Sequence, residues 1–195
     1  MKRKLNLNLL LFLVLIGLVL VSNILFASDT KELSIKEITS LSDNVVHGKV
    51  ISIISYWNYS KTTILTDVEV EIVTVYKGNL DKKKNTIIQL LGGTIDDIST
   101  IIIGGANFKI NEEVILFLKT PQIINLDINK QKHHIIALAQ GKYSVKMDKL
   151  NNTKVAYRSS FEMDDYPESN FNPQTRIKRE FNLKEFIKQI KNIDN

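Results

Sequence analysis

The chain contains no cysteine among its 195 residues. A disulfide framework, a thiolate metal site and a cysteine nucleophile are therefore all excluded. Proline, with three residues, and glycine, with eight, are scarce too, so collagen-like and disordered compositions do not apply. A domain without disulfides is held by its apolar core alone, and we expect a sizeable β or mixed core.

Familiar enzyme signatures are also missing. There is no Gly-x-Ser-x-Gly elbow, His-Glu-x-x-His helix, phosphate-binding glycine loop or dinucleotide fingerprint. Of the three histidines, His133 and His134 are adjacent on a predicted strand, so they point to opposite faces, and His47 lies on another strand. The carboxylate pairs Asp96–Asp97 and Asp164–Asp165 lack the spacing of a calcium loop. We therefore expect no metal site, no cofactor and no catalytic residue.

The net charge of +5 gives little support to a nucleic-acid partner. Three of the positive charges, Lys2, Arg3 and Lys4, stand at the N-terminus, and no acidic residue precedes Asp29. Without these three the remaining chain carries only +2. Such a balance is ordinary for a soluble domain and indicates no polyanionic partner.

The N-terminus has the three parts of a secretory signal. The basic start is followed by an apolar run from Leu9 to Val21 and by Ala27 before Ser28. We expect residues 1–27 to be a signal peptide that directs a secreted or extracytoplasmic domain. An uncleaved anchor stays open as the alternative, because residues 5–26 are long enough to span a bilayer. Apart from such an anchor, we expect no membrane partner.

Both ends of the exported part predict helices. Ser34 and Glu37 have the spacing of a capping box, followed by Ile35, Ile38 and Leu41 on one helical face. At the other end, residues 182–193 begin at a capping asparagine and form an amphipathic helix. We expect its apolar face to pack on the core, with a partner-binding or membrane-surface helix as the alternative.

The residues between the helices predict strands. Val45–Ile54 and Thr63–Tyr76 are the first two. In the second, Val68, Val70 and Ile72 alternate with Asp67, Glu69 and Glu71, which predicts one buried and one exposed face. The alternation slips at Ile72–Val73, which predicts a β-bulge with Val73 and Val75 both buried. Further strands are predicted at 86–91, 94–103, 113–118, 135–139 and 142–147. We expect residues 33–147 to form an all-β, small OB-like Greek-key barrel with flanking helices, and residues 148–181 an irregular surface segment.

Several motifs together resemble a pattern found in uncharacterised exported bacterial proteins. They are Asp43–Val50, Val68–Gly78, Gly92–Gly93, the turn and strand from Gly105 to Leu118, and Gln140–Val145. The sequence departs from the pattern at Asn111–Glu112, where the pattern has glycine followed by glutamate. The same order is remotely similar to the netrin-like domain of tissue inhibitors of metalloproteases, which implies a five-stranded OB barrel. Those inhibitors chelate zinc through an N-terminal cysteine, which this chain lacks, so the resemblance supports the fold and not that mechanism.

The most suggestive functional feature is aromatic. Tyr56, Trp57 and Tyr59 cluster at the end of the first predicted strand, close to Lys61. Exposed aromatic side chains at the mouth of a small barrel stack on sugars or bases, although Trp57 and one tyrosine would alternatively close the core. The sequence predicts an exported extracytoplasmic binding or interaction module without catalytic chemistry of its own. Its expected partner is an envelope polysaccharide or another exported protein, not a nucleic acid; the alternative is a cell-envelope hydrolase or an enzyme accessory protein.

Overall fold

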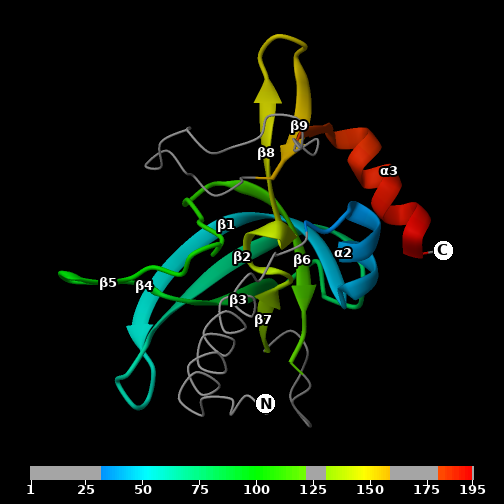
Figure 1. The fold of residues 1–195 in the computed structure, drawn as a ribbon. Coiled ribbons are helices and arrows are strands. Elements are labelled where there is room, and N and C mark those ends of the chain that lie inside the picture. The colour runs from blue at the N-terminus through cyan, green and yellow to red at the C-terminus, as the bar shows by residue number, and fades with distance from the viewer. Residues whose placement is uncertain (1–31, 122–130, 159–179, 195) are drawn as a thin grey trace, which may run out of the picture. The chain divides into compact units, whose positions relative to one another are not determined.

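A computed structural model of the protein describes residues 32–121, 131–158 and 180–194. These ranges contain two α-helices, a short 3₁₀ helix and ten strands (Figure 1). The helices are α2 (Ile35–Leu41), η3 (Leu138–Gly141) and α3 (Leu183–Asp194). The strands are β1 (Asn44–Trp57), β2 (Ile64–Lys77), β3 (Asn85–Leu91), β4 (Gly93–Ile95), β5 (Ile98–Thr100), β6 (Glu113–Lys119), β7 (Lys132–Ile135), β8 (Lys142–Asp148), β9 (Thr153–Tyr157) and β10 (Glu180–Asn182).

Five strands form a partly closed barrel. Their order is β1-β2-β3-β7-β6, and β6 pairs back onto β1 to close the ring. All of these pairings are antiparallel except that of β3 with β7, which is parallel and involves only Ile87 and Ile88 of β3. The predicted all-β, OB-like barrel with flanking helices is confirmed. From β6 the sheet continues outward through β8, β9 and β10.

The interior of the barrel is filled by aliphatic side chains from β1, β2, β3 and β6 and from the β2–β3 connection, and the half-buried Ile135 of β7 packs against them. Ten buried residues form this core: Val46, Val50, Val68, Val70, Ile72, Leu80, Ile88, Val114, Leu116 and Leu118. Val68, Val70 and Ile72 alternate with half-exposed or exposed acidic residues, as the sequence predicted.

The predicted bulge in β2 is present, but the prediction places Val73 in the core and the structure places it on the surface. His47 pairs with Thr74 and Gly48 with Ile72, so Val73 is the extra residue of the bulge. Val73 is 59% exposed, which makes its predicted burial wrong, whereas Val75 packs against the interior core. As the bulged residue, Val73 has no partner on β1 and turns outward, and the alternation of buried and exposed residues resumes after it in the sequence.

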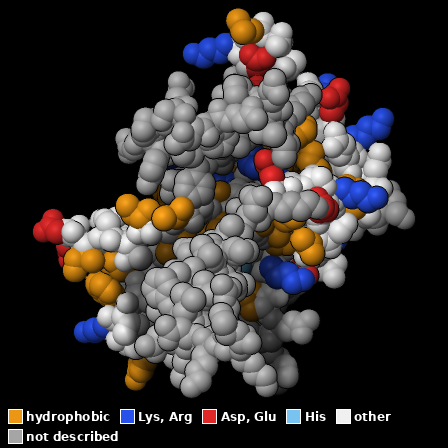
Figure 2. Space-filling model, viewed as in Figure 1, with side chains coloured by type: hydrophobic (Ala, Val, Ile, Leu, Met, Phe, Trp, Pro, Cys, Tyr) orange, Lys and Arg blue, Asp and Glu red, His pale blue; other side chains and the backbone are white. Residues whose placement is uncertain are grey.

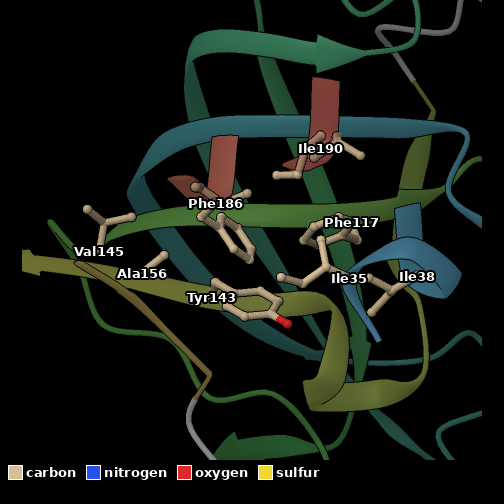
Figure 3. Packing of buried hydrophobic residues seen from close by; sticks show 10 residues of the cluster. Ile35, Ile38, Phe117, Tyr143, Val145, Ala156, Phe186 and Ile190 are labelled. Atoms are coloured by element: carbon tan, nitrogen blue, oxygen red, sulfur yellow. The ribbon is translucent and has the colours of Figure 1, made fainter. Parts of the chain in front are cut away.

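A second core lies between the outer face of the sheet and the two α-helices. It contains Ile35 and Ile38 of α2, Phe186 and Ile190 of α3, and side chains of β1, β6, β8 and β9 (Figure 3). Its centre is aromatic: the ring centroids of Tyr143 and Phe186 are 4.5 Å apart, and those of Phe117 and Tyr143 are 5.7 Å apart. The α3 face therefore packs on the domain, as expected.

Helix starts are close to the predictions. Ser34 and Glu37 form the capping box, with Glu37 N donating to Ser34 Oγ at 3.2 Å and Ser34 N to Glu37 Oε2 at 2.9 Å. Asn182 accepts from Lys184 N at 3.0 Å ahead of α3. Leu41, however, is 52% exposed, so its predicted place on the buried face is wrong: the short helix ends there, and its buried residues are Ile35, Ile38 and Thr39.

Two further predictions need correction. Residues 153–157, predicted to be part of an irregular segment, form strand β9, which pairs along β8 and buries Val155 and Ala156. Likewise residues 135–139 are not a strand, because β7 ends at Ile135 and the chain enters η3 through Ala137 at φ +50°. The pairing of β8 with both β6 and β9 occupies the place that a strand over 135–139 would take.

The turn before β6 explains the departure at Asn111. Asn111 has φ +67°, a left-handed conformation that glycine adopts freely and asparagine tolerates best among the other residues. Its amide donates to Val50 O, and Val50 N donates to Glu112 O, both at 2.9 Å. An asparagine therefore keeps the turn against β1 where the related pattern has glycine.

Candidate functional site

The β1–β2 turn, which carries Tyr59 and Lys61 of the predicted site, is built around Asn58. Its side-chain oxygen accepts from Thr62 N at 2.8 Å and Thr63 N at 3.2 Å, and its backbone N–H donates to Thr63 O at 2.9 Å. Lys61, at φ +54°, donates its amide to Asn58 O at 3.0 Å. This network presents Tyr59 and Lys61 at the tip, where both side chains are exposed.

The predicted aromatic residues do not share one face. Tyr59 is fully exposed and Trp57 is 36% exposed. Tyr56 and Trp57 are neighbours on β1 and therefore point to opposite faces of the strand. Tyr56 faces the outside of the barrel, whereas Trp57 pairs across the strands with buried Ile64.

Tyr56 is the centre of a polar cluster drawn from four strands. Its hydroxyl donates to Asp67 Oδ1 of β2 at 3.0 Å and accepts from Gln89 Nε2 of β3 at 2.7 Å and from Lys132 Nζ of β7 at 2.9 Å. Lys132 also donates to Asp67 Oδ2 at 2.6 Å, with its ammonium 4.9 Å from the centroid of the Tyr56 ring. We call Tyr56, Asp67, Gln89 and Lys132 the Tyr56 cluster.

The electrostatics of the cluster favour a charged lysine. Burial alone would lower the pKa of Lys132, but the hydrogen bonds to Asp67 and Tyr56 outweigh it and raise that pKa above its ordinary value. The Lys132 side chain is still 41% exposed, and that of Asp67 is 22% exposed. A ligand at this surface would therefore meet an ammonium, a carboxylate, a carboxamide and a phenol at once.

Exposed aliphatic side chains flank the cluster. Ile54 is 61% exposed and lies opposite Asp67 in the β1–β2 register, so it shares the outer face with Tyr56. Leu91 is 63% exposed and lies opposite Leu65, the cross-strand neighbour of Tyr56. Polar groups set between apolar side chains are typical of a surface that binds rather than one that is only solvated.

Asp67, Gln89 and Lys132 were missed by the sequence reasoning. They stand 11, 33 and 76 residues from Tyr56, and no local motif links them. Asp67 was predicted only to lie on the solvent-exposed face of its strand. Its alternation with valines was the one sequence signal that marked its position.

A second polar group lies on the outer face of β1, beside the helices. His47 Nε2 is 2.8 Å from Glu113 Oε1, and Tyr76 Oη is 3.2 Å from His47 Nδ1. Lys154 Nζ donates to both carboxylate oxygens of Glu113 at 2.8 Å. Burial raises the pKa of Glu113 less than the hydrogen bonds from Lys154 and His47 lower it, so its net pKa is lowered.

This group has the form of a base oriented by a carboxylate, but its hydroxyl partner is a poor nucleophile. Burial, and then the nearby Glu113 carboxylate, raise the pKa of Tyr76 and keep the phenol protonated. A His–Glu pair can still act as general acid or base if a substrate reaches it. The His47 side chain is only 12% exposed, which restricts that access.

The other candidate ligands stay apart. His133 is buried and lies 3.1 Å from Thr120 Oγ1, whereas His134 is exposed, so the predicted opposite orientation is confirmed. Asp96 and Asp97 are exposed at the β4–β5 turn, and Asp164–Asp165 lie outside the described residues. Within residues 32–121, 131–158 and 180–194, no three His, Asp or Glu side chains are grouped to hold a metal ion.

In the part of the chain that the structure describes, no helix is both long and apolar enough to cross a membrane. Neither a protein-family model nor a curated protein matches the chain.

Proposed function

We propose that the chain is an exported extracytoplasmic binding module that works through the outer face of β1, β2, β3 and β7. The observation that carries this proposal is the Tyr56 cluster, in which four different polar groups converge between exposed Ile54 and Leu91. The rigid β1–β2 turn adds Tyr59 and Trp57 at the same end of the strands. The resemblance to exported bacterial proteins and the signal-like residues 1–27 support a site outside the cytoplasm.

An envelope polysaccharide is the ligand that fits this surface best. Sugar hydroxyls both donate and accept hydrogen bonds. The Tyr56 hydroxyl is fully used within the cluster and holds it together, and the cluster offers a carboxylate that accepts, an ammonium that donates and a carboxamide that does both. The exposed aromatic side chains supply stacking worth about 1–3 kcal/mol per ring where a planar or sugar face lies on them. Weak contacts of this kind suit a repetitive polymer, because several modules or several sites along it act together.

Retention on isolated cell wall tests the proposal. Tyr56→Phe removes only the hydroxyl that joins the cluster, and we expect retention to fall about tenfold, equivalent to roughly 1.4 kcal/mol. Tyr157→Phe is the matched control, because Tyr157 is also a half-buried sheet tyrosine with a lysine ammonium, that of Lys146, 4.1 Å from its ring centroid. If the wild type and Tyr56→Phe are retained equally, the ligand does not bind at the Tyr56 cluster.

Tyr59→Ala separates the turn from the cluster. Tyr59 is fully exposed, so its loss leaves the unfolding midpoint unchanged, and any fall in retention reports contact with the ligand. Leu150→Ala, at an equally exposed position in the β8–β9 turn, is the control. If neither Tyr56→Phe nor Tyr59→Ala lowers retention, the proposed surface is wrong.

A cell-envelope hydrolase or enzyme accessory protein is the second candidate, and the His47–Glu113 pair is the observation that favours it. Release of dye-labelled fragments from cell wall by the wild type, abolished in His47→Gln, would support hydrolysis. No release by the wild type leaves only binding or accessory roles.

A further inference from the structure

The Tyr56 cluster lies within two rows of side chains that cross the outer face of the sheet. Each row contains one residue from each of β1, β2 and β3: Ile54, Asp67 and Gln89 in the first, and Tyr56, Leu65 and Leu91 in the second. Within a row, neighbouring Cβ atoms are about 5 Å apart, and residues of adjacent rows on one strand are about 7 Å apart. The exposed side chain of Ile54 therefore lies directly beside the Asp67 carboxylate.

The charges within the cluster cancel. The Lys132 ammonium and the Asp67 carboxylate form an ion pair at 2.6 Å. Glu69, the next acidic residue along β2, accepts from Asn85 Nδ2 at 2.8 Å. A charged ligand would be attracted by one member of the Lys132–Asp67 pair and repelled by the other. A neutral group that donates one hydrogen bond and accepts another gains from both members.

Three of the four side chains keep hydrogen-bonding capacity. Gln89 donates one amide proton to Tyr56 Oη at 2.7 Å, and in the part of the chain that the structure describes its side-chain carbonyl accepts from no donor. Lys132 uses two of its three protons, on Tyr56 Oη and on Asp67 Oδ2. Each Asp67 oxygen accepts one bond and has a lone pair left. Donors and acceptors thus remain side by side, which complements a secondary amide.

We propose that this face recognises the acetamido groups of an N-acetylated hexosamine polymer, an inference that rests on the proposed binding function and names the sugar substituent that is bound. The acetamido oxygen accepts from Lys132 or Gln89, and its N–H donates to Asp67. Its methyl group lies on Ile54, which is 61% exposed. A sugar hydroxyl at the same place would bond to the polar groups and leave the Ile54 side chain in water.

The position of the cluster in the sheet argues against a peptide as the source of the amide. Strands β2 and β3, which carry Asp67 and Gln89, are paired on both sides, β2 with β1 and β3, and β3 with β2 and β7. An extended peptide that binds to a sheet pairs its backbone with an open strand edge. The middle of this face offers side chains only.

Exposed apolar side chains continue beyond the cluster. Leu91, which ends β3, is 63% exposed, and the β4–β5 hairpin that follows it carries Ile98, which is 55% exposed. Figure 2 shows hydrophobic side chains gathered on the side of the molecule from which this hairpin projects in Figure 1. An N-acetylated polymer repeats its methyl group along the chain, so an apolar surface longer than one sugar fits the polymer better than a single sugar.

Three tetrasaccharides with the same β-1,4-linked glucan backbone test the proposal. Cellotetraose carries a hydroxyl on the second carbon of each sugar, chitotetraose carries an acetamido group there, and the deacetylated form of chitotetraose carries an amine that is largely cationic at about pH 6. In titration calorimetry at that pH we expect chitotetraose to bind at least about tenfold more tightly than either of the others. Equal binding of chitotetraose and cellotetraose, or tightest binding of the deacetylated form, would overturn the proposal.

Ile54→Thr tests where the acetamido group binds. This change keeps a β-branched side chain at an exposed position and removes apolar surface, so chitotetraose should bind about fourfold more weakly, as for one methyl-sized contact, while cellotetraose binding is unchanged. Val73→Thr, the same kind of change at the 59% exposed bulge, is the matched control. If the two variants bind chitotetraose equally well, the acetamido group does not lie on Ile54 and the proposal fails.

Retention on cell wall, measured on the same proteins, separates this inference from the proposed function. A wild type that is retained on cell wall but shows no preference for chitotetraose overturns the acetamido assignment alone. A wild type that is neither retained nor binds any of the three tetrasaccharides overturns both.

Discussion

Replacing Glu112 by glutamine is expected to destabilise the fold by about 3 to 5 kcal/mol. Lys142 Nζ lies 2.7 Å from Glu112 Oε1, and the two side chains are 4% and 16% exposed. The same carboxylate accepts from the Ser144 hydroxyl and, through Oε2, from Lys109 N at 3.0 Å. The Lys142 ammonium also lies 4.8 Å from the centroid of the Phe108 ring.

The magnitude follows from which partner is left buried. Glu112→Gln leaves the Lys142 ammonium in an almost fully covered site with a neutral carboxamide and the Ser144 hydroxyl in place of the Glu112 carboxylate, which is the costly outcome. Lys142→Met instead leaves a carboxylate that is partly exposed and keeps two other donors, so we expect about 1 to 3 kcal/mol. The double variant should be more stable than the sum of the two losses implies, because it removes both charges.

Urea unfolding of the wild type, the two single variants and the double variant measures these differences in the free energy of unfolding. Lys119→Met is the control: Lys119 pairs with Asp43 at 2.7 Å but is 59% exposed, so its loss should stay within about 1 kcal/mol. The reasoning fails if Glu112→Gln also stays within about 1 kcal/mol, or if the two losses simply add.

Three further outcomes are expected. Val70→Ala, which opens a cavity in the interior core, should cost about 1–3 kcal/mol, whereas Val73→Ala at the exposed bulge should cost less than about 0.5 kcal/mol; equal losses in urea unfolding would contradict the assigned bulge. Burial would raise the pKa of Asp43 and of Glu113, but hydrogen bonds from Lys119 and Thr120 to Asp43, and from Lys154 and His47 to Glu113, outweigh it and lower both pKa values. The stability that these two carboxylates contribute is present above their unfolded-state pKa values of about 4 and is lost as the pH falls through the folded-state values. A thermal unfolding midpoint that stays constant down to about pH 2 would count against these contacts. Mass spectrometry of protein from the producing cell should find an N-terminus near Ser28, and an intact Met1 in the membrane fraction would show that residues 1–27 are retained.

Local patterns were sufficient for much of the fold. The Ser34–Glu37 capping box and the alternation from Val68 to Ile72 depend only on neighbours in the sequence, and both are present. The bulge at Val73 was also visible as a slip in that alternation, but which residue turns outward depends on the register with β1. Strand β9 was missed because only two of its five residues, Val155 and Ala156, are buried, and their burial depends on pairing with β8 and β10.

The candidate site was predictable only in part for the same reason. Tyr56 stood out as an aromatic residue at a strand end, yet its partners come from β2, β3 and β7, and only the sheet register brings them together. The parallel pairing of β3 with β7 is what places Lys132 beside Tyr56. Neither this pairing nor the β2–β3 register, which sets Gln89 opposite Asp67, leaves a local signal in the sequence, so neither Lys132 nor Gln89 could be assigned beforehand.

The length of β1 explains why the proposed binding surface can lie where it does. Fourteen residues at about 3.3 Å each extend well beyond the part of the strand that β6 pairs with, which ends at Lys49. Along the paired half, the outer face is covered by the helices, and Val45 there is fully buried. Beyond the bulge at Ile51, the outer face carries Ile54 and Tyr56 and remains open. One strand thus serves the helix-covered core with its first half and presents the Tyr56 cluster with its second, so a ligand that reaches the cluster need not disturb either core.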